Sequence, residues 1–247
     1  MGRSGYRKNA CTVRNGLWAI GEGNVKALCS HVPCDVWLGA LALPAYAIHC
    51  KAVNTEQAMT PILELESARL RLRQWQDDDL TEFAALCADP LVMQYFPAPL
   101  SRLESAGLIG RIRGHFAEYG FGLWALERQN TGAFIGMTGL LNVSFDAAFT
   151  PAVEIGWRLA RRHWGQGFAS EAAWTCLRCA FAQLGLDEVV SFTTQSNLPS
   201  QKVMQAIGMQ PDPFGDFEHP RLEPGHPLRP HVLYRINRAQ WQSTLHG

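Results

Sequence analysis

The sequence predicts a mixed α+β fold, with a mostly antiparallel sheet of six to seven strands flanked by about four helices. Residues 69–73 and 153–159 alternate in the way typical of strands, whereas apolar residues recur at helical spacing over 169–184. An Asn-Thr-Gly run at 130–132, between two β-rich segments, indicates a hairpin. The succession of strand, helix and strand from 153 to 194 predicts one parallel crossover.

The first regular elements are expected from residue 69 onward. Residues 69–73, Arg-Leu-Arg-Leu-Arg, predict a strand with leucines inward and arginines on a solvated face. Asp77 to Asp79 supply capping and acidic first-turn residues for a helix that stops near Pro90. The remaining expected elements are a helix over 101–119, strands over 121–127, 133–143, 153–159 and 188–194, helices over 169–184 and 197–207, and a final strand pair near 209–217 and 231–236.

The composition argues against a partner recruited by overall charge. Lysine plus arginine equal aspartate plus glutamate at 22 each, and 47% of the 247 residues are hydrophobic, which suits an ordinary globular protein. We therefore expect no nucleic acid and no membrane among its partners, and any partner must be recognised locally.

A change in organisation is expected at Met59. Residues 1–58 show neither a strand period nor a helix period, so they predict a poorly ordered N-terminal extension before one domain over 59–247. Two explanations stay open: a flexible natural extension, or translated upstream sequence before a physiological start at Met59. The cysteines and histidines at 29–50 match no zinc-site spacing, so no metal is expected.

The most informative stretch is residues 161–170, Arg-Arg-His-Trp-Gly-Gln-Gly-Phe-Ala-Ser, between an expected strand and an expected helix. Its glycines let several backbone N–H groups point at one anion, and the helix N-terminus adds partial positive charge, so a phosphate cradle is predicted. A Walker loop requires Gly-Lys-Ser/Thr, which the chain lacks. The dinucleotide fingerprint requires glycine or alanine where Ser170 stands, near the start of a doubly wound series, and does not fit either.

Arg162, Gly165 and Gly167 fit the pattern R/Q-x-x-G-x-G/A, with Ala169 following. The stretch resembles the acyl-coenzyme A loop of the GNAT superfamily of N-acetyltransferases. The resemblance covers about residues 60–240 and includes the element order, the strand entering the loop and the runs at 197–200 and 206–209. Within the superfamily, the chain is most similar to the bacterial ribosomal-protein N-terminal alanine and serine acetyltransferases. The resemblance implies a GNAT-like acyl-coenzyme A N-acyltransferase domain over 59–247.

The resemblance also implies roles for individual residues. The strand before the loop would pair with the pantetheine arm of acetyl-coenzyme A, and the loop would hold its pyrophosphate. Ser200 would protonate the departing thiolate, and Glu154 would take a proton from the amine through water. The implied cofactor-binding residues are Trp157, Arg158, Leu159, Arg162, Gly165, Gln166, Gly167, Phe168, Ala169 and Asn197, and the implied acceptor pocket contains Tyr95, Phe96 and Trp124.

Several of these residues have simpler explanations when taken alone. Asn197 is placed to cap a helix, and could serve as both cap and ligand. Ser200 would be an ordinary surface residue of that helix, Glu154 a solvent-facing strand residue and Trp124 a core residue. These alternatives stay open at the level of the sequence.

The expected function is transfer of an acetyl group from acetyl-coenzyme A to a primary amine, by direct attack in a ternary complex. No cysteine lies in a nucleophile context, which favours this route over an acyl-enzyme. The acceptor stays open between a protein N-terminus and a small-molecule amine, and the alternative function is a non-catalytic acyl-coenzyme A sensor or structural relative. A monomer or homodimer is expected, and the cofactor implies a cytoplasmic protein.

Overall fold

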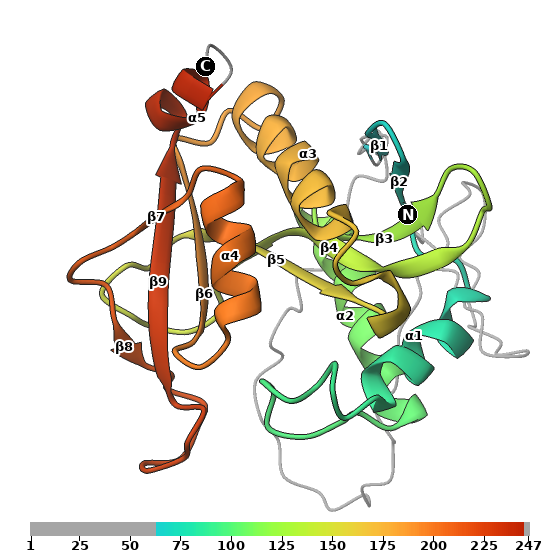
Figure 1. The fold of residues 1–247 in the computed structure, drawn as a ribbon, viewed down its shortest axis with the longest axis horizontal. Coiled ribbons are helices and arrows are strands. Elements are labelled where there is room, and N and C mark those ends of the chain that lie inside the picture. The colour runs from blue at the N-terminus through green and yellow to red at the C-terminus, as the bar shows by residue number, and fades with distance from the viewer. Residues whose placement is uncertain (1–62, 245–247) are drawn as a thin grey trace, which may run out of the picture. The chain divides into compact units, whose positions relative to one another are not determined.

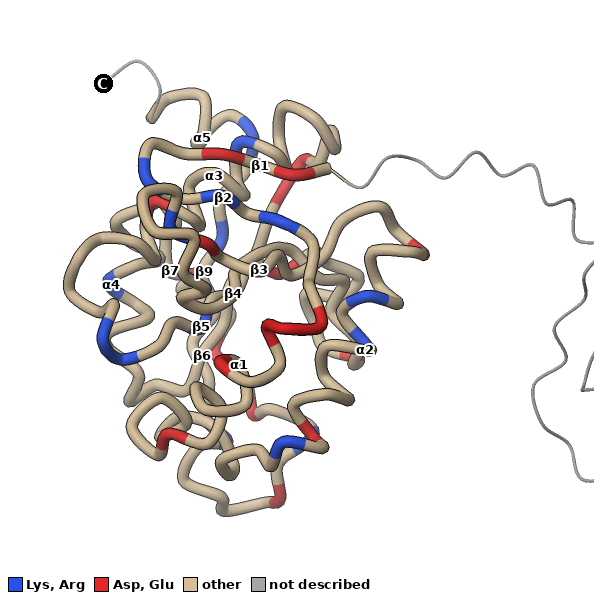
Figure 2. Tube along the Cα trace, turned by 90° about the vertical axis from the view of Figure 1, so that its right-hand side faces the viewer, with Lys and Arg blue, Asp and Glu red and all other residues tan. Residues whose placement is uncertain are grey.

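The structure is a computed structural model that describes residues 63–244 (Figure 1). The expectations for residues 1–58, namely the extension, the alternative start and the unmatched zinc spacing, lie outside the described residues. Basic and acidic positions are interspersed along the described chain (Figure 2). Within it, no helix combines the length and the apolar character that crossing a membrane requires.

The described residues form one mixed sheet of nine strands in the order β1-β2-β3-β4-β5-β6-β9-β7, with β8 pairing β9. All neighbours are antiparallel except β5 and β6. The expected hairpin and the expected parallel crossover are both confirmed. The strands are β1 (Leu65–Glu66), β2 (Leu70–Arg73), β3 (Leu123–Arg128), β4 (Phe134–Asn142), β5 (Val153–Leu159), β6 (Glu188–Thr194), β7 (Gln210–Pro211), β8 (Phe217–Glu218) and β9 (Pro230–Asn237).

Five α-helices and one 3₁₀ turn complete the described fold. Ser101 begins α2 with a capping box: its hydroxyl accepts from the Glu104 N–H, and the Glu104 carboxylate accepts from the Ser101 N–H. Gly120 ends the same helix at φ 77°. The helices are α1 (Asp79–Ala88), α2 (Arg102–Tyr119), η1 (Arg161–His163), α3 (Phe168–Ala182), α4 (Leu198–Ala206) and α5 (Arg238–Thr244).

The sheet opens between β5 and β6. Their parallel pairing is confined to Glu154 and Val190. Beyond this point the two strands point apart, as Figure 1 shows. Beyond Glu154, the edge of β5 that faces β6 has no strand partner: the Ile155 and Leu159 carbonyls accept from the Ser191 hydroxyl and the Trp164 indole, and Trp157 lies between them.

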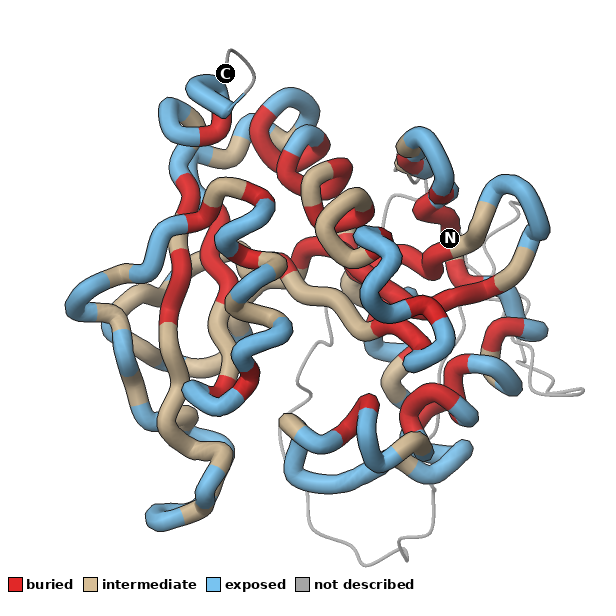
Figure 3. Tube along the Cα trace, in the orientation of Figure 1, coloured by how far each residue is buried: buried red, intermediate tan, exposed pale blue. Residues whose placement is uncertain are grey.

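The two faces of β5 contact different helices, because neighbouring residues of a strand point to opposite faces. The Cys176 thiol of α3 hydrogen-bonds Thr138, the β4 partner of Trp157. Arg158 instead donates to the Cys87 sulfur of α1, at 3.2 Å. We call the face that carries Glu154, Gly156 and Arg158 the α1 face. The opposite face is the α3 face, against which α3 packs with mostly buried residues, coloured red in Figure 3.

Two sequence-based expectations at the ends of the sheet were wrong in detail. Residues 209–217 are not one strand: β7 and β8 pair with β9 separately, and the prolines at 211 and 213 lack the N–H that a continuous ladder needs. The structure also contains β1 and α5, which were not expected. A two-residue strand is too short to show a period.

The expectation that the arginines of β2 lie on a solvated face was wrong at Arg73. Arg71 is exposed, but Arg73 is buried, with bonds of 2.8 Å from each Nη to the two carboxylate oxygens of Asp79. Its Nε donates to Glu127 at 2.6 Å. The Asp79 carboxylate also accepts from the Gln76 N–H, and the N-cap residue itself makes no side-chain cap bond. Asp79 is therefore half of a buried ion pair.

Candidate functional site

The predicted cradle lies where β5 ends and α3 begins. Gly165 has φ 70° and Gly167 has φ 79°, in the left-handed region that favours glycine. Gly167 is the N-cap of α3, so no side chain satisfies the first N–H groups of that helix. A Cβ built on Gly165 would meet open space. Free helix N–H groups beside an open surface form an anion site, which fits a diphosphate.

Arg69, which was expected on the solvated face of a strand, lies against this cradle. The Arg69 guanidinium stands 4.4 Å over the Phe168 ring and donates to the Gln166 carbonyl at 3.0 Å. Its ion pair with Glu171, at 2.6 Å, ties the start of β2 to the first turn of α3. An alternating strand pattern cannot reveal this contact, because the partners are about a hundred residues apart.

Arg162, the basic residue of the loop motif, pairs with an acidic side chain of α1. Its Nη2 donates to Glu82 of α1 at 2.8 Å, and its Nε donates to the ring of His163. Both members of the Arg162–Glu82 pair are more than half exposed, so the pair is weak and can exchange for another anion. The Arg162 carbonyl accepts from the Gln166 side chain, which braces the loop.

Glu154 has the electrostatics of a proton acceptor at neutral pH. Burial raises the pKa of its carboxyl to about 7, against a smaller opposing effect of Arg221. It is the residue at which β5 and β6 still pair. A carboxyl with a pKa near 7 can exchange a proton with an amine under physiological conditions. Glu154 is partly exposed, so it is neither a core residue nor a fully solvent-facing one.

Asn197 caps α4, as its position predicts. Its Oδ1 accepts from the Ser200 N–H at 3.2 Å, and its Nδ2 donates to the hydroxyls of Thr193, at 2.9 Å, and Ser200, at 3.1 Å. The side chain is buried, and its hydrogen bonds tie the end of β6 to the start of α4. Because the Ser200 oxygen accepts here, its own hydrogen stays free for donation.

A cluster of aromatic rings adjoins Glu154 on the α1 face. Val190 pairs with Glu154, and Phe192 follows two residues later on the same face of β6. Each ring of the cluster is partly exposed, and together they connect the β4–β5 loop with β6, β8 and β9. This aromatic cluster consists of Phe145, Phe149, Phe192, Phe217, His219 and His231.

Comparison with known proteins identifies the family. The model of the acetyltransferase (GNAT) domain matches residues 69–210, which is more than half of the chain. The chain belongs to the GNAT family. It is 33% identical to the uncharacterized protein YkkB of Bacillus subtilis over 147 residues, which is 59% of this chain and 84% of that protein. It is 30% identical to the uncharacterized N-acetyltransferase YoaA of the same organism, over 62% of this chain and 84% of that protein.

Solved structures agree with this assignment at the level of the fold. Spermidine N-acetyltransferase from Vibrio cholerae, solved in complex with CoA and spermine, has a TM-score of 0.57 and 18% identity, over 71% of this chain and 99% of that chain. The GNAT resemblance, the α+β fold and acetyl-coenzyme A-dependent N-acetyltransferase activity are thereby confirmed. In the described part of this GNAT chain, no group of three or more His, Cys, Asp or Glu is placed to hold a metal.

The residues expected to line the acceptor pocket of this GNAT domain divide into two groups. Trp124 is fully buried, donates its indole N–H to the Leu63 carbonyl and packs on Phe116, so it is a core residue and does not line an accessible pocket. Tyr95 is partly exposed, and Phe96 is exposed at the α1 face, 4.1 Å from the Arg158 guanidinium carbon. Sequence alone could not separate the three, because the same aromatic residue types occur in cores and in pockets.

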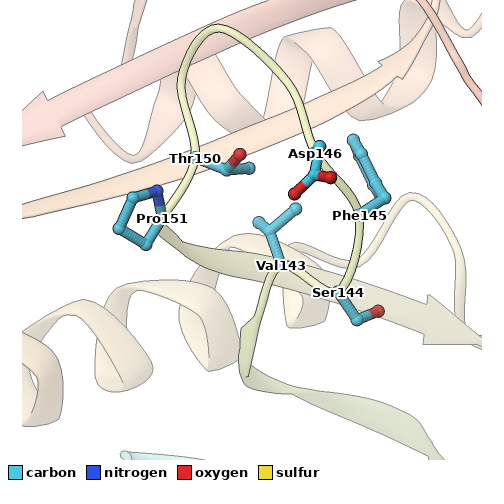
Figure 4. Close-up of a pocket in the computed structure, with 6 residues that line it drawn as sticks. All are labelled: Val143, Ser144, Phe145, Asp146, Thr150 and Pro151. Carbon is cyan, nitrogen blue, oxygen red and sulfur yellow. The ribbon is translucent and has the colours of Figure 1, made fainter.

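Two hollows of about 400 Å³ lie at the N-terminal end of β5 in the GNAT domain, away from the cradle. Figure 4 shows the first, of about 390 Å³, which lies entirely in the loop between β4 and β5 and includes Phe145 of the aromatic cluster. Neither hollow includes a cradle residue. The hollow of Figure 4 is therefore separate from the cradle.

Proposed function

We propose that this GNAT domain acetylates a primary amine by direct attack on acetyl-coenzyme A in a ternary complex. The cradle at residues 162–169 holds the diphosphate of the cofactor, and the separating edges of β5 and β6 receive its pantetheine arm. The observation that carries the proposal is the pair of left-handed glycines at the uncapped start of α3, beside the opening between β5 and β6.

Glu154 is the proton acceptor in this proposal. The amine nitrogen forms a bond to the thioester carbonyl carbon, and the carbon–sulfur bond then breaks. The proton lost by the nitrogen passes to the Glu154 carboxylate, directly or through water. The pKa of about 7 supports this role, since it leaves a base present at neutral pH and makes the protonated form attainable.

Ser200 is the donor of a proton to the departing thiolate in this proposal. Its oxygen already accepts a hydrogen bond from Asn197, which leaves its O–H to point elsewhere. The Asn197 side chain is occupied by its cap and by Thr193, so in this proposal it acts on the cofactor through its hold on the β6–α4 corner. The contact between Asn197 and pantetheine that the resemblance implies would require one of these bonds to exchange.

The cysteines support direct attack over an acyl-enzyme. Cys87, Cys176 and Cys179 are all buried. Burial raises the pKa of the Cys176 thiol well above its usual range, and raises that of Cys179 to about 11. Thiols with raised pKa values have little thiolate at neutral pH and are poor nucleophiles.

Release of thiol from acetyl-coenzyme A in the presence of amines tests the proposal. A panel should include peptides with free N-termini, amino acids, polyamines and other small amines. We expect thiol release that depends on the amine and produces the acetylated amine. Tight coenzyme A binding without acetyl transfer to any member would favour the sensor alternative. Absence of binding to coenzyme A would overturn the assignment of the cradle.

A further inference from the structure

Arg158 is a partly buried cation without a carboxylate partner among the described residues. Its Nη1 donates to the Cys87 sulfur at 3.2 Å, and its guanidinium carbon lies 4.1 Å from the centre of the Phe96 ring. Its Nε is shielded from solvent and has no hydrogen-bond partner. A thiol sulfur is a weak acceptor, so the guanidinium retains unused donors. Burial lowers its pKa, which shows that the site disfavours an unaccompanied positive charge.

Two other arginines that are largely shielded from solvent each bind two carboxylates. Arg73 binds two carboxylates in the core, and Arg235 pairs with both Asp212 and Glu188 at 2.6 Å. Arg69 combines a ring contact with a carboxylate, whereas Arg158 combines its ring contact only with the Cys87 sulfur. An anion would complete the contacts of Arg158, whose charge has no carboxylate partner among the described residues.

The position of Arg158 places this missing anion at the acceptor site. Glu154, Gly156 and Arg158 follow one another on the α1 face of β5. A Cβ built on Gly156 would meet no atom within 4 Å, so the strand between the carboxyl and the guanidinium is uncovered. Arg221, whose charge acts on Glu154, also pairs with no carboxylate among the described residues and donates instead to Ser144.

We propose that the acceptor is a primary amine that also carries a carboxylate, and that Arg158 binds this carboxylate while the amine lies over Gly156 toward Glu154. The inference rests on the proposed function and adds the class of acceptor. Arg158 has a planar fork of donors that matches the two oxygens of a carboxylate. The Phe96 ring holds the face of the guanidinium and leaves its edge for the ligand. A polycationic acceptor would place positive charge beside Arg158 and Arg221.

Acceptors in matched pairs test the inference. Each pair consists of an amino acid or dipeptide and its C-terminal amide, so the two differ in the carboxylate. We expect kcat/KM of the protein to favour the carboxylate form by at least tenfold in the preferred pair. In Arg158→Gln this preference should fall to near unity, with the KM for acetyl-coenzyme A unchanged. Comparing the ratio between the two proteins cancels the difference in amine pKa within a pair.

Two further variants separate binding from folding. Arg71→Gln removes an exposed arginine of β2 and should keep the wild-type preference. Arg158→Lys keeps the charge but loses the fork, and should give an intermediate preference. The melting temperature of each variant shows whether it folds. A preference for the amide form, or a carboxylate preference that survives in Arg158→Gln, would overturn the inference.

A binding measurement keeps the inference separate from the activity. N-acetylated members of the panel, with and without the carboxylate, are titrated by calorimetry into the protein saturated with coenzyme A. We expect the carboxylate forms to bind at least tenfold more tightly than the amides, and Arg158→Gln to lose the difference. Such binding without turnover would overturn the proposed function and retain the site. Turnover of polyamines with no carboxylate binding would do the reverse.

Discussion

Glu154 and Arg158 share the α1 face of β5, with the single bare position Gly156 between them. One is a carboxyl whose pKa burial raises to about 7, and the other is a guanidinium without a carboxylate partner among the described residues. A strand repeats its side-chain direction every second residue, so the two side chains extend from the same face although their Cα atoms are about 13 Å apart. A ligand over Gly156 would lie between them.

Glu154→Gln should lower kcat while leaving the affinity for coenzyme A unchanged. The amide cannot accept the proton of the attacking amine, and a positioned base contributes about 10²- to 10⁴-fold. The carboxylate is the active form, so kcat of the wild type should fall as pH drops below about 7. The variant should lose this limb. A pH profile of kcat at saturating substrates measures both effects, and an unchanged limb in the variant would assign it to another group.

Gly167→Val should weaken coenzyme A binding by tenfold or more. The residue has φ 79°, and its Cβ would lie 3.4 Å from the Arg69 guanidinium beside the uncapped end of α3. Gly185→Val is the matched control, because Gly185 has φ 70° after the same helix and a Cβ there would meet open space. Both variants carry a similar backbone strain, of about 1–3 kcal/mol. Calorimetric titration should show a binding defect in the first alone, and equal defects would indicate a general loss of folding.

Ser200→Ala should lower kcat with little change in the dissociation constant of coenzyme A. The variant removes the O–H proposed to donate to the thiolate, but keeps the backbone N–H that Asn197 caps. Steady-state kinetics combined with titration separates the two quantities. Equal turnover of the variant and the wild type would remove Ser200 from the mechanism and leave it as a residue of the β6–α4 corner.

The sequence was informative about this fold where the signal is local. The hairpin at 130–132, the helix expected over 101–119 and the glycines of the cradle each depend on residues that are close together in the sequence. For the same reason, the boundaries of β6 agree with the expected strand over 188–194. Local propensity and chain period are enough to indicate these features.

The functional surroundings could not be predicted as well, because they depend on contacts between distant segments. Three contacts each join parts of the chain that share no sequence pattern. They are Arg69 with the cradle, Glu82 with Arg162 and Phe96 with Arg158. The family resemblance selected Glu154 and Arg158 from their positions on one strand. It assigned Arg158 a backbone role, whereas the structure shows a side chain with unused donors.

Arg73→Met should destabilise the fold strongly, in contrast to Arg71→Met on the same strand. Arg73 is 4% exposed and holds the buried Asp79 carboxylate through two bonds, so the substitution leaves a buried charge without its partner. Breaking such a pair costs about 3–5 kcal/mol. Arg71 pairs with Glu64 at an exposed position, where substitutions usually stay within about 0.5 kcal/mol. Denaturant unfolding of both variants measures the two free energies. Joint replacement of Arg73 and Asp79 by apolar residues should recover part of the loss, because it removes the Asp79 charge and leaves only the less buried Glu127 without its partner. A double variant as unstable as Arg73→Met would place the cost in lost packing instead.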